Sequence, residues 1–157
     1  MRTPKLSLTL QTVSRAMNLP SRRDFQTWIS AALGKRAAEI TLRIVDAAEG
    51  QALNLAYRGK DYATNVLTFV FDDLPPNLPL TGDIILCAPV VVAEATEQQK
   101  TLLAHYAHLT IHGVLHLQGF DHEQDAQALI MENRERALLQ QLGFPDPYAQ
   151  EENNSLD

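Results

Sequence analysis

The stretch from His112 to His122, HGVLHLQGFDH, places three histidines at spacings of four and six residues. Residues four apart on a helix lie on one face, about 6 Å apart along its axis, so His112 and His116 can approach the same ion. Gly119 comes before the third histidine, where a glycine can take the positive φ that turns a chain back across a helix end. We therefore predict that a helix ends here and that His112, His116 and His122 bind one metal ion.

The five histidines of the chain lie between His105 and His122 and leave a rival pair open. His108 and His112 are also four apart, but His108 and His116 would lie about 12 Å apart along a straight helix, too far to share one tetrahedral ion. The returning His122 favours the pair His112 and His116. His105 and His108 fit either a groove that receives phosphate or a packed helix seam.

The histidine spacing matches the HExxHxxGxxH signature of zinc peptidases, in which three imidazoles leave one coordination position open. Zinc is the expected metal, although nickel, copper and iron accept the same ligands. Gly113 stands where a peptidase has the glutamate that acts as general base, which argues against peptide hydrolysis. We expect no peptide-binding edge elsewhere, and we expect Gly113→Glu to place a carboxylate beside the metal, where it repels phosphate. Cys87 fits either a fourth ligand or an ordinary buried thiol.

The rest of the chain predicts strands that alternate with helices. Apolar runs and alternation indicate strands over residues 6–13, 40–45, 65–71 and 83–87. Apolar residues at helical spacing indicate helices over residues 21–34, 47–57, 88–99, 101–117 and 124–142. We therefore predict an α+β fold with a small mixed four-stranded sheet, about five helices and a zincin-like metal site on a C-terminal helix.

The composition is that of a single domain. The 157 residues are 45% hydrophobic, enough for one packed core, and we expect one domain over residues 1–157 with a frayed acidic tail from about residue 150. Thirteen basic against nineteen acidic residues give a net charge of −6, which excludes a generally basic protein that coats nucleic acid. One cysteine, and no run of about 18 apolar residues, predict a reducing, cytoplasmic location without a membrane span.

Several motifs resemble those of one known family, in the same order along the chain. YRGKDYATNVLTF at Tyr57–Phe69 looks like RGKxxxTxVLSF, TGDIILC at Thr81–Cys87 looks like a GDIxIC strand, and LGFPDPY at Leu142–Tyr148 looks like the family's C-terminal end. With the histidine stretch, they resemble the YbeY family of metal-dependent endoribonucleases over nearly the whole chain. Thr68 and Val70 depart from the family's usual Ser and Pro.

This resemblance implies one zinc ion per chain, held by His112, His116 and His122. It implies cleavage of single-stranded RNA, including maturation of the 3′ end of the small-subunit ribosomal RNA, and quality control of defective ribosomes. Arg58, ahead of the GKD turn, is the residue that the resemblance makes important for activity. The implied partners are ribosomal RNA, the small ribosomal subunit, one of its proteins and a ribosome-associated GTPase.

The chemistry of these residues suits an RNA phosphodiester. A zinc ion can lower the pKa of bound water to about 7 or polarise a phosphoryl oxygen, and either water or the ribose 2′-hydroxyl fits as nucleophile. Arg58 can offset charge on a phosphate, or it can be a solvated arginine at a helix end. Asp121 can orient a ligand imidazole, or it can cap the following helix. Arg58, Lys60 and Lys100 can form a local basic patch.

Three functions are compatible with these residues. The first is a zinc-dependent endoribonuclease that acts in ribosomal RNA maturation. The second is a metal hydrolase of a small molecule, favoured by the lack of base-stacking aromatic residues near the histidines other than Phe120. The third is a ribosome-binding maturation factor whose zinc mainly stabilises the fold. Cleavage of single-stranded RNA with and without a chelator separates these functions.

Overall fold

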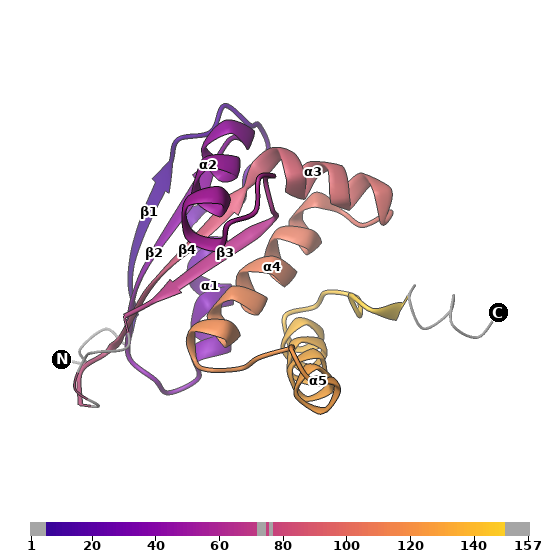
Figure 1. The fold of residues 1–157 in the computed structure, drawn as a ribbon. Coiled ribbons are helices and arrows are strands. Elements are labelled where there is room, and N and C mark those ends of the chain that lie inside the picture. The colour runs from indigo at the N-terminus through magenta and orange to yellow at the C-terminus, as the bar shows by residue number, and fades with distance from the viewer. Residues whose placement is uncertain (1–5, 72–74, 76, 150–157) are drawn as a thin grey trace.

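The computed structural model describes residues 6–71, 75 and 77–149, and within them it contains a four-stranded mixed sheet. The strands are β1 (Leu6–Thr12), β2 (Ala38–Val45), β3 (Val66–Val70) and β4 (Leu80–Cys87). Their order is β1-β2-β4-β3, with β1, β2 and β4 parallel and β3 antiparallel to β4 (Figure 1). β3 is therefore an edge strand that is paired on one side.

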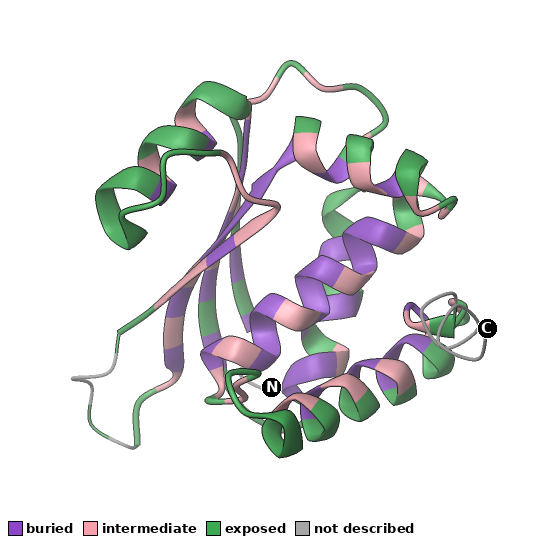
Figure 2. Cartoon of the chain, turned by 45° about the vertical axis from the view of Figure 1, so that its right-hand side comes forward, coloured by how far each residue is buried: buried purple, intermediate pink, exposed green. Residues whose placement is uncertain are grey.

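Five helices surround the sheet in this part of the chain. They are α1 (Arg22–Leu33), α2 (Ala47–Arg58), α3 (Ala88–Glu97), α4 (Leu102–Leu117) and α5 (Asp125–Gln141). Figure 2 shows α2 on one face of the sheet and α1 and α4 on the other. α5 packs on the outer side of α4, away from the sheet (Figure 1). No helix within the described residues combines the length and the apolar character needed to cross a membrane.

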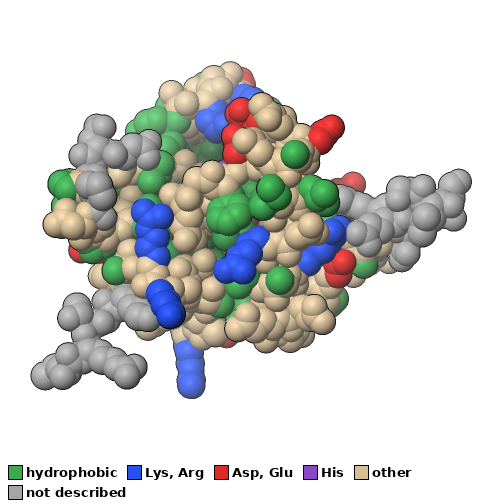
Figure 3. Space-filling model, turned by 90° about the horizontal axis from the view of Figure 1, so that it is seen from below, with side chains coloured by type: hydrophobic (Ala, Val, Ile, Leu, Met, Phe, Trp, Pro, Cys, Tyr) green, Lys and Arg blue, Asp and Glu red, His purple; other side chains and the backbone are tan. Residues whose placement is uncertain are grey.

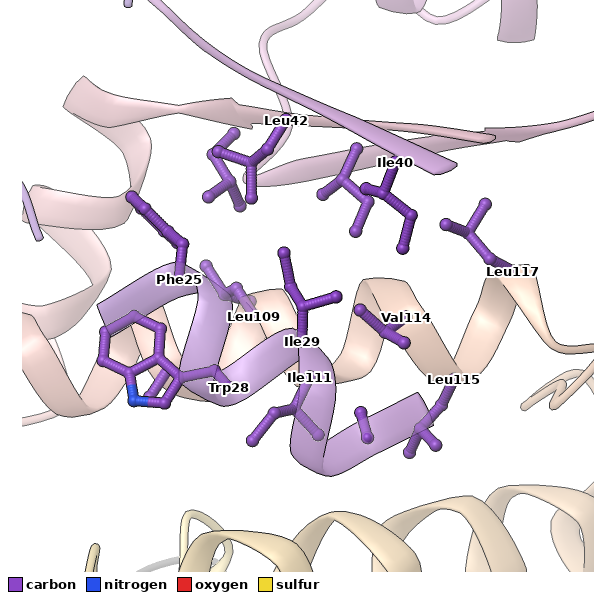
Figure 4. Close-up of a cluster of buried hydrophobic side chains, with 14 of the residues drawn as sticks. Phe25, Trp28, Ile29, Ile40, Leu42, Leu109, Ile111, Val114, Leu115 and Leu117 are labelled. Atoms are coloured by element: carbon purple, nitrogen blue, oxygen red, sulfur yellow. The ribbon is translucent and has the colours of Figure 1, made fainter. Parts of the chain in front are cut away.

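The main core lies between the sheet and the helices α1 and α4. Its α1 residues recur at helical spacing, and its strand residues come from alternate positions. Because α4 is packed against the sheet, α1 and α5, the side chains along it have fixed positions. The buried residues labelled in Figure 4 are Phe25, Trp28, Ile29, Ile40, Leu42, Leu109, Ile111, Val114, Leu115 and Leu117.

A smaller core lies on the face of the sheet that α2 covers. Its buried members are Val45, Leu67, Ile85 and Cys87, and Phe69 packs against them. Successive strand residues point to opposite faces, so Cys87 lies on the side of the sheet away from α4. Of the two roles expected for Cys87, the structure shows the buried thiol, and burial raises the pKa of that thiol.

The architecture confirms the predicted α+β fold with a four-stranded mixed sheet and five helices. The largest difference is β4, which begins at Leu80 instead of the predicted Asp83 because it pairs with β2 along its whole length. Gly82 interrupts the apolar pattern from which the strand was predicted. A glycine is nevertheless needed at this position, since a Cβ would lie 2.8 Å from Cδ2 of Leu117. The predicted tail from about residue 150 lies outside the described residues, and the single domain over residues 1–157 stays a prediction.

Candidate metal centre

Three histidine side chains converge at the C-terminal end of α4, and we call His112, His116 and His122 the histidine triad. Their candidate ligand atoms lie within 4.8 Å of one another. The ring centroids are 4.7 Å apart for His112 and His116, 4.9 Å for His116 and His122, and 5.5 Å for His112 and His122. Three imidazoles are the donor set of a zinc site with an open position, so the triad could hold one metal ion.

A chain reversal after α4 brings His122 back to the helix. The helix ends at Leu117, and Gly119 has a φ of 100°, a conformation that residues with a Cβ rarely adopt. The N–H of Gly119 donates to the carbonyl of His116, and the N–H of Phe120 donates to the carbonyl of Leu115. These two bonds close the turn that the position of Gly119 predicts.

Asp121 shapes the backbone of this turn. Its Oδ1 accepts a hydrogen bond from the N–H of His122 at 2.6 Å and another from the N–H of Glu123 at 3.2 Å. Asp121 therefore closes the turn itself and does not cap α5, whose N-cap is Gln124. Within the described residues, no hydrogen bond joins its carboxylate to a triad imidazole.

A buried carboxylate that sequence reasoning missed orients His112. Glu135 of α5 is fully buried, and its Oε1 lies 3.2 Å from Nδ1 of His112 and 2.7 Å from Nε2 of His108. The hydroxyl of Tyr148 donates to the same carboxylate at 3.0 Å. Because Nδ1 of His112 faces Glu135, Nε2 is the nitrogen left for a metal.

The sequence did contain a signal for Glu135. The residue shares one helical stripe with Met131, Leu138 and Leu139, which are all buried. A carboxylate in an apolar stripe needs a buried partner, and the histidines of α4 are the partners that the structure supplies.

The pKa values of Glu135 and His116 favour binding of a cation by the triad. Burial alone would raise the pKa of Glu135, but the hydrogen bonds from His108 and His112 and the charge of those imidazoles hold it at about 2. Burial, together with the neighbouring imidazoles of His112 and His122, lowers the pKa of His116 to about 4. At neutral pH His116 is therefore uncharged, and its lone pair is available to a metal.

The triad opens into a cavity of about 540 Å³. Arg58, the last residue of α2, lines this cavity, and no hydrogen bond or ion pair engages its guanidinium within the described part of the chain. The carboxylates of Asp121 and Glu123 also line it. The structure thus brings the predicted residue Arg58 to the same cavity as the three histidines.

The local basic patch is smaller than the sequence suggested. Lys60 is exposed and is not among the residues that line the cavity. The ammonium group of Lys100 donates to the carbonyl of Pro147 at 2.8 Å, and Lys100 lines a second cavity of about 290 Å³. Among the described residues, Arg58 is thus the cation that lines the triad's cavity.

His105 and His108 belong to a buried polar seam along α4. His105 lies 2.9 Å from Glu94 of α3, and Asn65 donates to the same carboxylate at 3.0 Å. His108 is engaged with Glu135 through its Nε2. Of the two interpretations of these histidines, the structure supports the packed seam, because neither of them lines the triad's cavity.

Aromatic side chains reach the cavity from distant parts of the sequence. Tyr57 and Phe69 both line it. Phe120, the aromatic residue expected there, packs against the main core instead. The lack of aromatic residues near the histidines was the observation that favoured a small-molecule substrate, and the structure does not support it.

Comparisons with known proteins identify the family. The family model described as Endoribonuclease YbeY matches residues 11–143. The chain belongs to the endoribonuclease YbeY family. The protein named Endoribonuclease YbeY from Nitrosomonas europaea is 56% identical over 144 residues, which cover 92% of this chain and 85% of the relative. The protein of the same name from Chromobacterium violaceum is 55% identical over 151 residues, which cover 94% of this chain and 90% of the relative.

A solved structure shares the fold. The solution structure of TM1509 from Thermotoga maritima matches with a TM-score of 0.59 and covers 93% of each chain, at 22% identity. This likeness concerns the fold alone. Membership of the YbeY family supports a hydrolase that cleaves RNA, while the ligand roles of the triad and the catalytic role of Arg58 stay predictions.

Proposed function

We propose that this chain is a zinc-dependent endoribonuclease that cleaves single-stranded ribosomal RNA, with His112, His116 and His122 as metal ligands and Arg58 as a catalytic residue. The observation that carries the proposal is that three imidazoles and one unengaged guanidinium share a cavity of about 540 Å³. RNA as the substrate is supported by relatives that are named endoribonucleases.

Each part of the site has a distinct task in the cleavage of a phosphodiester. A zinc ion, when bound, acts as a Lewis acid that stabilises negative charge on a phosphoryl oxygen. Glu135 holds His112 with its Nε2 free for the metal, and the turn at Gly119 holds His122 beside α4. Arg58 presents a planar guanidinium to the phosphate and offsets the charge that develops in the transition state.

The openness of the triad favours a catalytic metal over a mainly structural one. His122 is exposed, and His112 and His116 are half-buried. Structural zinc sites usually have four protein ligands, whereas the group found within the described residues has three. A ribosome-binding factor with a structural zinc is therefore the less supported function.

The proposal extends to the cellular role that the family resemblance implies. It includes maturation of the 3′ end of the small-subunit ribosomal RNA and quality control of defective ribosomes, in the cytoplasm. The partners are the small ribosomal subunit, one of its proteins and a ribosome-associated GTPase. The motifs at Tyr57–Phe69, Thr81–Cys87 and Leu142–Tyr148 support this part of the proposal.

Metal analysis and cleavage of a defined single-stranded RNA test the proposal together. We expect about one zinc per chain, loss of cleavage on chelation and its return when zinc is added back. His116→Ala should lose the zinc, because two imidazoles bind it far more weakly than three. His105→Gln is the matched control, since His105 lies on the same helix but pairs with Glu94. Cleavage that resists the chelator, or zinc retained by His116→Ala, would contradict the proposal.

A further inference from the structure

Tyr57 and Phe69 form an aromatic pair on the wall of the triad's cavity, which we call the aromatic corner. Their ring centroids are 4.9 Å apart, and the ring planes are inclined by 63°. An edge-to-face contact of this kind restrains the orientation of both rings. Tyr57 directly precedes Arg58 at the end of α2, so the corner and the guanidinium come from adjacent positions.

The two rings of the corner have different surroundings. Phe69 packs against the smaller core beneath α2, whereas Tyr57 is 68% exposed. A tyrosine ring has few rotatable bonds, and here an anchored neighbour restrains it further, so covering it with a ligand costs little conformational entropy. The Tyr57 ring of the corner therefore offers a flat apolar face that is held in place and open to solvent.

The edge of β3 that no other described strand pairs with adds hydrogen-bonding groups to the same wall. The N–H of Cys87 donates to the carbonyl of Asn65, and the N–H of Phe71 donates to the carbonyl of Thr81. Along an antiparallel strand, residues whose backbone groups bond to the neighbouring strand alternate with residues whose backbone groups face the other way. Asn65 and Phe71 are of the first kind, so Thr68 is of the second and directs its N–H and C=O away from β4. Thr68 lines the cavity, which places a backbone donor and acceptor between the corner and the triad's helix.

We propose that the aromatic corner is a stacking subsite for one unpaired nucleobase, next to the phosphate that Arg58 and the triad receive. This inference rests on the proposed function and specifies which part of the RNA the site recognises. A flat ring joined to an anion is the chemistry of a nucleotide, and every base has a face that can stack on an aromatic side chain. Bases inside a duplex are already stacked on both faces, so the subsite selects single-stranded RNA.

Single nucleotides test the subsite without cleavage, because they contain no internucleotide bond. The probes are adenosine 5′-monophosphate and ribose 5-phosphate, which share sugar and phosphate and differ in the base. We expect the zinc-loaded protein to bind the nucleotide about tenfold more tightly, with upfield ring-current shifts of the adenine protons in NMR spectra. Tyr57→Leu should remove the difference between the probes, and Tyr57→Phe should retain it.

Tyr62→Leu is the matched control, since Tyr62 is 54% exposed but is not among the residues that line the cavity. It should bind both probes as the wild type does. Equal affinity of the wild-type protein for the two probes, or adenine shifts that persist in Tyr57→Leu, would overturn the stacking subsite.

Cleavage of single-stranded RNA separates failure of the subsite from failure of the proposed function. We expect Tyr57→Leu to keep its zinc and to raise the KM for RNA about tenfold. Wild-type cleavage with an unchanged KM in Tyr57→Leu contradicts the subsite alone. Absence of wild-type cleavage in the presence of zinc contradicts the proposed function, and the nucleotide probes still decide the subsite.

Discussion

Glu135 links two histidines of α4 that have different tasks. His112 belongs to the triad, whereas His108 lies deeper in the seam, and both contact the same carboxylate oxygen. Tyr148 adds a third donor. A buried carboxylate with three donors cannot rotate without losing several bonds, so it fixes the ring of His112 in one orientation.

We expect Glu135→Gln to lower zinc affinity about 10- to 100-fold, because an amide is a weaker acceptor and does not balance charge on His112. Competition with a chromophoric chelator measures the dissociation constant. Glu135→Ala should also melt at a lower temperature, since His108 and Tyr148 lose a buried acceptor. Glu132→Gln, on the same helix, should change neither quantity. An unchanged zinc affinity in Glu135→Gln would show that Glu135 does not position the ligand.

Arg58 carries a prediction that separates chemistry from binding of the metal. Arg58→Ala should reduce single-turnover cleavage about 100-fold or more, because the transition state loses an electrostatic donor, while the zinc content stays the same. Arg58→Lys should recover part of the loss, since an ammonium group supplies charge without the planar fork. Lys60→Ala is the control, because Lys60 is exposed beside Arg58 without lining the cavity. Equal rates for Arg58→Ala and the wild type would leave Arg58 as a solvated helix-end residue.

At the scale of elements, α4 has two faces with different functions. One face carries the histidines, and the other packs on the sheet. Gly113 lies on the sheet face, where a Cβ would lie 3.3 Å from Cγ2 of Ile84 and 3.4 Å from Cγ2 of Thr68. A glutamate at this position would therefore enter the contact between α4 and the sheet instead of lying beside the metal, as the sequence signature had suggested.

Gly113→Glu should accordingly lower the stability of the fold and not act by repelling phosphate at the metal. We expect the Tm to fall by about 10 °C or more, because the variant forces a carboxylate into an apolar contact. Circular dichroism melts measure the change, and RNA cleavage should fall with the folded fraction. Gly113→Ala should change the Tm little. Alanine gains about 1 kcal/mol in helix propensity, and the tight contact of its Cβ with Ile84 offsets that gain. A Gly113→Glu protein that melts like the wild type would contradict the assignment of this face.

The element β3 bears on peptide hydrolysis as well. We expected no peptide-binding strand edge, but within the described residues β3 pairs with β4 alone and presents its other edge along the triad's cavity. The site still differs from a zinc peptidase, because Gly113 stands where the HExxH signature has the glutamate that activates water. Because α4 contains no Asp or Glu at all, no carboxylate of this helix can act as the peptidase general base, and we expect no peptidase activity.

At the scale of the whole molecule, the net charge does not attract RNA, so the positive charge that binds a phosphate has to come from the triad's cavity. The chain carries a net charge of −6, and Figure 3 shows Lys and Arg side chains spread over one face among hydrophobic ones instead of forming one continuous patch. Within the cavity, Arg58 is accompanied by Asp121 and Glu123. A bound divalent metal would therefore supply much of the positive charge that a phosphate meets there.

The stability of the whole molecule should fall in alkaline solution through Tyr106. Burial raises the pKa of Tyr106 from 10 to about 12, so the fold favours the neutral phenol. The stability that this preference contributes is fully present below about pH 10 and is lost as the pH rises toward 12, because the unfolded chain ionises first.

Tyr106→Phe should remove this part of the alkaline loss. At pH 7 it should be nearly neutral or stabilising, because the hydroxyl of Tyr106 has no hydrogen-bond partner among the described residues. Urea unfolding at pH 7 and pH 11 measures both effects, and Tyr62→Phe, which changes an exposed tyrosine, should retain the wild-type loss. An identical alkaline loss in Tyr106→Phe and the wild type would contradict the prediction.

The sequence by itself determined the elements of the fold and the grouping of the triad. Spacing of four residues on a helix predicted the approach of His112 and His116, and Gly119 predicted the reversal that returns His122. The strands and helices were also predictable, because periodic burial and helix-ending glycines are local properties of a chain. Family motifs added Arg58, which has no periodic signal of its own.

Only the tertiary structure decided which residues surround the triad. Glu135 reaches His112 from α5, and Tyr57 and Phe69 reach the cavity from α2 and β3. Lys100, which the sequence grouped with Arg58, lies at another cavity. These contacts join residues far apart in the chain, and their geometry depends on how helices pack on a sheet. Spacing within one element carries no information about that packing, so the residues that position and line the site were visible only in the folded molecule.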